Sequence, residues 1–358
     1  MLRIKILAIN PGSTSTKIAV YINDKSIFLK TVRHDAEELD IFEKISDQFE
    51  YRKNAILTEL KNADIEIDKI NAIVGRGGLV KPVEGGVYEV NDALKRDLEI
   101  GVMGEHASNL GGLIALDIAK TIDNARAFIA NPVVVDELQD VARVSGHPDF
   151  QRVSIFHALN HKAIARQFAK SRDVLYEEMN LIIAHLGGGI SVGAHYRGKV
   201  IDVNNALDGE GAFSPERSGT LPAGQLLRAC FSGNHTLSDI KKIVTGKGGL
   251  MAYFGTNSAY EIELRADDGD EKAQFIQDAM AYQIGKAIGE MAAVLHGEVH
   301  GILITGGIAN NKKLINYVRN MIGFIAPVFV YPGEDEMSAL AMNGLMVLRN
   351  EMECKEYK

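Results

Sequence analysis

Cysteine is scarce in this sequence, and long apolar runs are missing. The two cysteines, Cys230 and Cys354, cannot build a disulfide framework or a four-thiolate zinc site, and their scarcity fits a reducing compartment. No window approaches the roughly 18 uninterrupted apolar residues of a membrane-spanning helix. The apolar run at the start is broken at Asn10 and Pro11, which leaves it too short for a signal peptide. We therefore expect a cytoplasmic protein with no membrane partner.

Basic residues are also in the minority. The chain has 39 Lys and Arg against 47 Asp and Glu, a formal net charge of −8. A broad nucleic-acid footprint needs a basic face, so we expect no nucleic-acid partner. A small anionic ligand needs only one local basic cluster, so binding of such a ligand remains possible.

The length and the order of elements indicate an α/β protein. At about 150 residues per domain, the 358 residues predict two domains. Short apolar segments typical of strands alternate with segments of helical spacing, among them a final helix from Met337 to Glu351.

One pattern occurs twice. Apolar strands at residues 4–9 and 181–184 each lead into a small polar or glycine-rich loop, and each loop leads into a second apolar strand. Aligning Asn10 with His185 gives an offset of 175 residues, close to half of the chain. The sequence therefore predicts a duplicated architecture. Coincidence is the alternative, because hairpins with glycine turns are common.

The residues that follow apolar strands point to phosphate binding. The loop Asn10–Lys17 offers backbone N–H groups, several hydroxyls and one ammonium group, the donors that hold phosphoryl oxygens. It is not a Walker loop, because a strand follows it, and a plain Ser/Thr-rich turn is the alternative. Gly187–Gly189 would let the backbone approach a ligand closely, and Gly306–Gly307 stands at a predicted helix start.

Two histidines lie four residues apart, at His157 and His161. This is zinc-ligand spacing on a helix, but the residue after the first histidine is Ala158 rather than the glutamate of zinc proteases. A zinc site, a packed or hydrogen-bonded histidine pair and a role in stabilising an anion all remain open.

Two arginines and two carboxylates complete the candidates. Arg76 stands between glycines and Arg217 in a polar loop, and a solvated loop arginine is the alternative for both. Asp136 follows the apolar run Val133–Val135, a position typical of metal-binding aspartates at strand ends. Glu336 is expected to cap the last helix, where it either binds a metal or interacts with the helix dipole.

These motifs resemble those of the acetate and butyrate kinase family, in the family's order and over nearly the whole chain. The motifs that resemble the family as a whole are Asn10–Lys17, Phe156-His157 with His161, His185–Gly189, Arg217–Gly219 and Thr305–Ile308. Those that resemble its butyrate kinase branch are Gly75–Leu79, Asn131–Asp136 and Asp208–Arg217.

The resemblance implies the duplicated ribonuclease H-like fold of the sugar kinase, Hsp70 and actin superfamily, with ATP in the cleft between two lobes. The expected lobes are residues 1–150 with about 338–358, and residues 151–337. The implied reaction is reversible in-line transfer of a phosphoryl group between ATP and butyrate, or a similar short or branched fatty acid, giving butyryl phosphate and ADP. The implied cofactors are ATP/ADP and Mg²⁺, the partners a carboxylate and an acyl phosphate, and the assembly a homo-oligomer of two or more subunits.

The resemblance also implies roles for individual residues. Arg76 would hold the substrate carboxylate, Arg217 the transferring phosphoryl group, and His157 would donate to a phosphoryl oxygen. Asp136 and Glu336 would position magnesium, directly or through water. The expected cofactor-binding residues are Asn10, Ser13, Ser15, Lys17, His185, Gly187, Gly188, Gly189, Gly306, Gly307 and Asn310. Phe156 and Gly78 would line the substrate pocket with Arg76; acetate kinases have valine where this chain has Gly78, so we expect room for a longer acyl chain.

Other classes remain as alternatives. An acetate or propionate kinase of the same family would share the motifs that are common to the family as a whole. A superfamily ATPase would share the phosphate loops without needing the two arginines. A sugar kinase would need an aspartate as general base, a role that Asp136 could fill.

Overall fold

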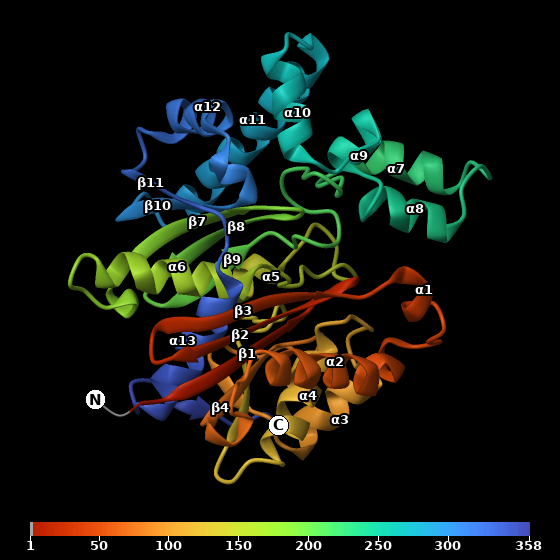
Figure 1. Cartoon of the computed structure of the whole chain (residues 1–358). Helices are drawn as coiled ribbons and strands as arrows, with labels where there is room; N and C mark the ends of the chain where they lie inside the picture. The colour runs from red at the N-terminus through yellow and green to blue at the C-terminus, as the bar shows by residue number, and fades with distance from the viewer. Residues whose placement is uncertain (1–2) are drawn as a thin grey trace. The chain divides into compact units, whose positions relative to one another are not determined.

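The computed structural model describes residues 3–358 and divides into two compact units (Figure 1). Unit 1 runs to Val135 and also includes Asp335–Lys358, and unit 2 is Asp136–Glu334. In the described chain, no helix combines the length and the apolar character needed to cross a membrane.

Unit 1 contains a seven-stranded sheet in the order β12-β5-β6-β4-β1-β2-β3. Its strands are β1 (Lys5–Pro11), β2 (Ser15–Ile22), β3 (Lys25–Arg33), β4 (Ala72–Arg76), β5 (Val87–Glu89), β6 (Arg126–Ala130) and β12 (Cys354–Lys355). β1, β2 and β3 form an antiparallel meander, and β4 and β6 add to β1 in parallel. β1 is buried along its whole length.

The helices of unit 1 are α1 (Ala36–Leu39), α2 (Phe49–Asn62), α3 (Asp92–Ile100), α4 (Asn109–Ala119) and α13 (Glu336–Leu348). Of these, α2, α4 and α13 pack on the strands, and α3 packs on α4. Helix α4 approaches β4 very closely, because a Cβ atom on Gly75 would lie 2.2 Å from the Gly111 carbonyl oxygen. Asp335, rather than the expected Glu336, caps α13, since its side chain accepts the Ser338 N–H.

Unit 2 contains a five-stranded sheet in the order β11-β10-β7-β8-β9. Its strands are β7 (Asn180–Leu186), β8 (Ile190–Tyr196), β9 (Lys199–Val203), β10 (Gly301–Gly306) and β11 (Val328–Pro332). Its helices are α5 (Asp140–Arg143), α6 (Ala158–Lys170), α7 (Ala223–Cys230), α8 (Leu237–Val244), α9 (Gly249–Phe254), α10 (Ala259–Asp267), α11 (Glu271–Val294) and α12 (Lys312–Ile322). Figure 1 shows α7, α8 and α9 grouped together to one side of the β7–β9 strands.

The two sheets repeat one strand pattern, which confirms the predicted duplication and the α/β class. In unit 2, β7, β8 and β9 form the antiparallel meander, and β10 and β11 add to β7 in parallel. The second strand of each meander carries an irregularity at nearly the same place, between Val20 and Tyr21 in one and between Ala194 and His195 in the other.

The run Val133–Val135 is not a strand, contrary to expectation. Asn131 adopts a φ of 39°, and Pro132 has no N–H to donate, so the chain turns directly after β6. Val135 forms an isolated bridge to Val83, outside the named strands.

A buried arginine holds the first hairpin loop. Arg52 lies in α2 with no exposed surface. Its Nη2 donates to the Ser13 carbonyl at 2.8 Å, and its Nη1 donates to the carbonyls of Gly12 at 2.8 Å and Ser15 at 3.3 Å. Its Nε donates to Gln48 Oε1 at 2.9 Å. Within residues 3–358 it forms no ion pair, so its charge is compensated by carbonyl dipoles.

Replacing this guanidinium should destabilise unit 1. Arg52→Lys keeps the charge, but one ammonium group cannot serve carbonyls that now bind separate nitrogens. Because carbonyls are left unpaired, we expect the free energy of unfolding to fall by about 1–3 kcal/mol, measured by urea denaturation. The control is Arg126→Lys, at an exposed pair with Glu89, where the loss should stay below about 1 kcal/mol. Equal losses in both variants would contradict this role for Arg52.

His34 should make stability depend on pH. Burial, and then the charge of Arg52, lowers the pKa of His34 from 6.5 to about 4. Between pH 6.5 and 4 the unfolded chain therefore binds more protons than the folded one, so stability falls as the pH is lowered through this window. Glutamine cannot titrate. Over the same pH range, we therefore expect the free energy of unfolding to fall by about 1–3 kcal/mol less in His34→Gln than in the wild type. Parallel pH profiles for the two proteins would count against this effect.

Candidate functional site

In unit 1, three predicted residues meet at the carboxyl ends of two parallel strands. Asn10 lies in β1, Arg76 ends β4, and Glu336 begins α13. Asn10 Nδ2 donates to Glu336 Oε2 at 2.5 Å. Arg76 Nη1 donates to the same oxygen at 3.2 Å, and its Nη2 lies 3.2 Å from Glu336 Oε1. The guanidinium of Arg76 thus holds a carboxylate in two-point fashion, the geometry that suits carboxylate recognition.

The hairpin loop beside this cluster exposes its polar groups. Ser13 and Lys17 are exposed and Ser15 is half-buried, while the Gly12 N–H donates to the Ser15 carbonyl at 2.7 Å. Lys17 is the β2 partner of Asn10 in the strand register. The loop is therefore a hydrogen-bonded turn that presents an ammonium group and hydroxyls at its surface.

Gly78 is not beside open space. A Cβ atom there would lie 2.4 Å from Asn109 Oδ1 and 2.9 Å from Leu98 Cδ2. Asn109 in turn accepts the Leu79 N–H at 2.8 Å. The room left by the missing side chain is taken up by α3 and α4, so the packing gives a structural reason for glycine and does not support the expected wider substrate pocket.

In unit 2, Arg217 lies directly over the second glycine loop. A Cβ atom on Gly189 would lie 1.9 Å from Arg217 Nη1, so only glycine fits beneath the guanidinium. Arg217 Nη1 donates to the Ala206 carbonyl at 2.6 Å, whereas its buried Nε has no hydrogen-bond partner within the described chain. Burial lowers the pKa of Arg217, opposed by the charge of Glu216. A buried cation with an unused N–H donor beside a glycine loop is suited to an anion.

The loop that carries Arg217 is tied to the glycine loop. Ser214 Oγ donates to the Gly188 carbonyl at 2.6 Å and accepts the Arg217 N–H at 3.2 Å. Neither Ser214 nor Ala206 was predicted, because a bond to a distant backbone carbonyl leaves no local sequence pattern.

Two histidines of unit 2, His157 and His185, stack beside this loop. His157 and His185 stack with ring centroids 3.9 Å apart and an interplanar angle of 18°. His185 Nδ1 lies 2.9 Å from Asn160 Oδ1, and its Nε2 lies 3.4 Å from Glu334 Oε2. A Cβ atom on Gly187 would come within 2.8 Å of His185 Nε2.

His157 and His161 do not lie side by side on a helix face as predicted. His157 precedes α6 as its N-cap residue, and His161 is fully buried inside the helix's first turns. Their rings share a partner instead, because Ser191 Oγ lies 2.8 Å from His157 Nδ1 and 2.9 Å from His161 Nε2. Phe156 is buried and packs edge-on against His161, with the ring centroids 5.2 Å apart.

The third glycine segment ends β10. Gly306 has a φ of 95°, and a Cβ atom there would lie 2.3 Å from the Leu186 carbonyl oxygen. Gly307 and Asn310 are exposed and belong to a short 3-10 turn, in which Asn310 Nδ2 donates to the Gly307 carbonyl at 2.9 Å. α12 then begins with Asn311 as its cap, one residue beyond this turn.

The two predicted magnesium carboxylates lie in different units. Asp136 Oδ2 accepts from Arg143 Nη1 at 2.6 Å, a bond that raises the pKa of Arg143. Residues 3–358 contain no cluster of three or more His, Cys, Asp or Glu side chains that could hold a metal. Magnesium usually takes one or two protein carboxylates and completes its shell with water and phosphate oxygens. A single carboxylate, such as that of Asp136 or Glu336, is therefore enough for the protein's share of the ligands.

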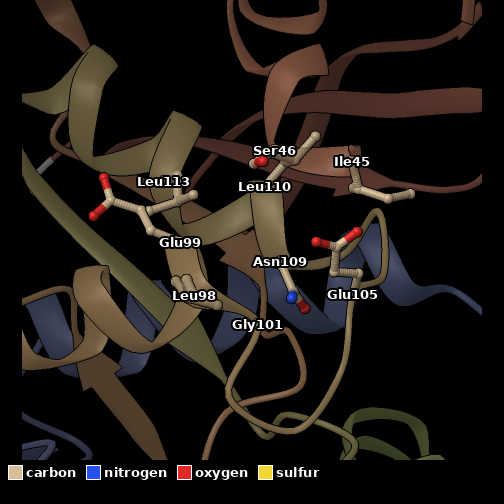
Figure 2. A pocket seen from close by; sticks show the side chains of 9 residues that line it. All are labelled: Ile45, Ser46, Leu98, Glu99, Gly101, Glu105, Asn109, Leu110 and Leu113. Atoms are coloured by element: carbon tan, nitrogen blue, oxygen red, sulfur yellow. The ribbon is translucent and has the colours of Figure 1, made fainter. Parts of the chain in front are cut away.

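A small pocket of unit 1 lies apart from these clusters. Figure 2 shows Leu98, Leu110 and Leu113 with Glu99 and Glu105 around it. Its open space is about that of one water molecule. Of the described residues that line it, none is a predicted site residue, and it is too small for a nucleotide.

Comparisons with known proteins agree with these motifs. The model of the acetokinase family matches residues 151–325. Butyrate kinase 2 of Clostridium acetobutylicum is 55% identical over 357 residues, covering 100% of both chains. A probable butyrate kinase of Bacteroides thetaiotaomicron is 53% identical over 354 residues, covering 99% of this chain and 100% of its own.

Solved structures agree on the fold. The acetate kinase of Porphyromonas gingivalis superposes with a TM-score of 0.78 at 19% identity, over 96% of this chain and 100% of its own. A propionate kinase of Francisella tularensis superposes with a TM-score of 0.73 at 17% identity, over 95% of this chain and 98% of its own. These likenesses confirm the expected fold class. Together with the full-length relatives, they show that the chain belongs to the acetokinase family and is a carboxylate kinase.

Proposed function

We propose that this carboxylate kinase transfers the γ-phosphoryl group of ATP to butyrate, or to a similar short or branched fatty acid, in a reversible in-line reaction that yields an acyl phosphate and ADP. The observation that carries the proposal is the identity of 53–55% to butyrate kinases along the whole chain. In this proposal, units 1 and 2 correspond to the two ribonuclease H-like lobes, and the enzyme works as a homo-oligomer.

The chemistry needs cations and donors rather than a base. A carboxylate is already ionised at neutral pH, so no proton has to be removed from it. The obstacle is repulsion between that anion and the phosphoryl oxygens. Catalysis then consists mainly of positioning and of stabilising the charge that develops on the transferring group.

Arg76 would hold the substrate carboxylate. Its two-point contact with Glu336 is the geometry that a carboxylate requires from a guanidinium. Phe156 would contribute an apolar wall, and the choice of acyl chain would depend on such surfaces rather than on Gly78.

Arg217 would stabilise the transferring phosphoryl group. Its unpaired Nε is a donor that is already removed from water. Little solvent or protein reorganisation is therefore needed when negative charge develops beside it. His157 would donate to an equatorial phosphoryl oxygen. Gly187, Gly188 and Gly189, together with His185, would let the phosphates approach the backbone.

The remaining predicted residues would bind the nucleotide and its metal. Asn10, Ser13, Ser15 and Lys17 would contact phosphates, and Gly306, Gly307 and Asn310 would lie near the nucleoside. Asp136 and Glu336 would hold Mg²⁺ directly or through water. When bound, the ion would neutralise phosphate charge during transfer.

The substrate assignment predicts a preference for longer acids. We expect four- and five-carbon acids to exceed acetate by roughly tenfold in kcat/KM, since each extra buried methylene contributes about 0.8 kcal/mol. The measurement is trapping of the acyl phosphate with hydroxylamine, in the presence of ATP and Mg²⁺, for acids of two to six carbons. Equal or better kcat/KM for acetate would contradict the butyrate assignment, and phosphorylation of sugars instead of acids would contradict the acceptor class.

The role of Arg217 can be tested both by displacing its guanidinium and by removing it. Gly189→Ala places a methyl group where Arg217 Nη1 now lies, so the guanidinium must move. We expect kcat to fall about 10- to 100-fold, and Arg217→Ala to cost about 100- to 1,000-fold, with little change in the KM for ATP. Gly289→Ala is the control, because nothing lies within 4 Å of a Cβ atom there. Near-normal turnover in both Gly189→Ala and Arg217→Ala would refute the role.

A further inference from the structure

Four hydrogen bonds form a continuous line through the interior of unit 2 and end at His157. Tyr176 Oη lies 2.7 Å from His195 Nδ1, and His195 Nε2 lies 3.2 Å from His161 Nδ1. His161 Nε2 lies 2.9 Å from Ser191 Oγ, which lies 2.8 Å from His157 Nδ1. Ser191, His161 and His195 have no exposed surface, and Tyr176 is 2% exposed.

The proton arrangement of such a line is set by the two hydroxyl groups in it, Tyr176 at its start and Ser191 beside His157. Burial, and then the charge of Glu137, holds the pKa of the Tyr176 hydroxyl well above 10, so the hydroxyl keeps its proton. Among the described residues, its hydrogen-bond partner is His195. If the hydroxyl only accepted, its own O–H would be a buried donor without an acceptor, which is costly. Tyr176 therefore donates to His195 Nδ1.

The remaining bonds follow in turn. Burial lowers the pKa of His195 and of His161 well below 6.5, so each ring is neutral and has one N–H. With Nδ1 accepting, His195 donates from Nε2 to His161 Nδ1, and His161 donates from Nε2 to Ser191 Oγ. Among the described residues, Ser191 Oγ is hydrogen-bonded only to His161 and His157. Because it accepts from His161, its hydroxyl donates to His157 Nδ1; otherwise the buried O–H would have no acceptor. A neutral His157 carries its proton on Nε2.

We propose that Tyr176, His195, His161 and Ser191 are positioning residues that hold His157 as its Nε2–H tautomer, so that the ring presents a hydrogen-bond donor. This inference rests on the proposed function, in which His157 donates to a phosphoryl oxygen. The opposite arrangement would leave Nε2 as an acceptor, which a phosphoryl oxygen would repel.

The surroundings of His157 also fix the plane of its ring. His185 stacks on it with centroids 3.9 Å apart, and Asn160 orients His185 through its Nδ1. The line of hydrogen bonds therefore specifies the tautomer while the stacking specifies the orientation, the two properties that a histidine donor needs.

The test measures the tautomers directly. In the full chain labelled with ¹⁵N-histidine, long-range ¹H–¹⁵N correlation spectra distinguish Nε2–H from Nδ1–H rings, and His→Gln variants assign the signals. We expect the Nε2–H pattern for His157, His161 and His195. An Nδ1–H pattern at His157 would overturn the inference.

Two variants each remove one hydroxyl donor from the line of hydrogen bonds. Tyr176→Phe removes the first donor and Ser191→Ala the last one, and each should give mixed tautomers at His157. We expect kcat to fall by about 2- to 10-fold with an unchanged KM for ATP, because the line is released but not forced into the opposite arrangement. If Tyr176→Phe does not fold, Ser191→Ala decides the matter alone. An unchanged His157 spectrum in the folded variants would also overturn the inference.

Tyr357→Phe is the matched control. Tyr357 is 3% exposed, and its hydroxyl donates to Asp97 at 2.8 Å in unit 1, so the variant should leave the three histidine spectra unchanged. The outcomes separate the two proposals. The Nε2–H pattern in a protein that phosphorylates no acid refutes the proposed function alone, whereas an Nδ1–H pattern in an active kinase refutes the positioning inference alone.

Discussion

Burial of the central strands is the constraint that decides where polar side chains can stand in each unit. β1 and β10 are buried over their whole length, and their backbone groups are paired with neighbouring strands. An unpaired polar side chain in the middle of such a strand would be costly. The polar groups therefore gather where the strands end, as Asn10 and Arg76 do in unit 1 and His185 does in unit 2.

The duplication shows two ways of holding the same hairpin. Thr16 and Ser191 occupy equivalent positions at the offset of 175, both are fully buried, and both bond to histidine rings. In unit 1 a charged group, Arg52, binds the loop carbonyls and also Thr16 Oγ1 at 3.2 Å. In unit 2 a neutral line of imidazoles leads away from the hydroxyl instead. Equivalent positions of the two hairpins thus contact a charged guanidinium in one unit and neutral imidazole rings in the other.

The sequence was sufficient for the strand pattern because buried parallel strands appear as short apolar runs, and glycine-rich loops mark their ends. It was insufficient where a backbone detail decided the outcome. Val133–Val135 is as apolar as a strand, yet the positive φ of Asn131 and the missing N–H of Pro132 turn the chain first. Glu336 has the chemistry of a cap, but it is the first residue of the helix, and Asp335 directly before it occupies the N-cap position.

Partners far apart in the sequence were the second limit. Arg52 binds carbonyls 37 to 40 residues away, and carbonyls carry no sequence signature. Ser191 could have been found, because the offset that relates Asn10 to His185 also relates it to Thr16. The residues of a glycine-rich or Ser/Thr-rich loop are thus easier to predict from the sequence than the distant residues that hold the loop in place.

The contact between Arg76 and Glu336 has a consequence for how such a site selects its acid. A carboxylate already occupies the guanidinium at two points, so an acid that binds Arg76 exchanges one ion pair for another. The two carboxylates are chemically alike, and their contributions to the free energy of the exchange largely cancel. The remaining free energy depends on what each carboxylate is attached to: the Glu336 carboxylate to the protein backbone, and the carboxylate of the acid to a mobile acyl chain. Discrimination among acids would then come from the apolar tail, with the charged head common to all of them.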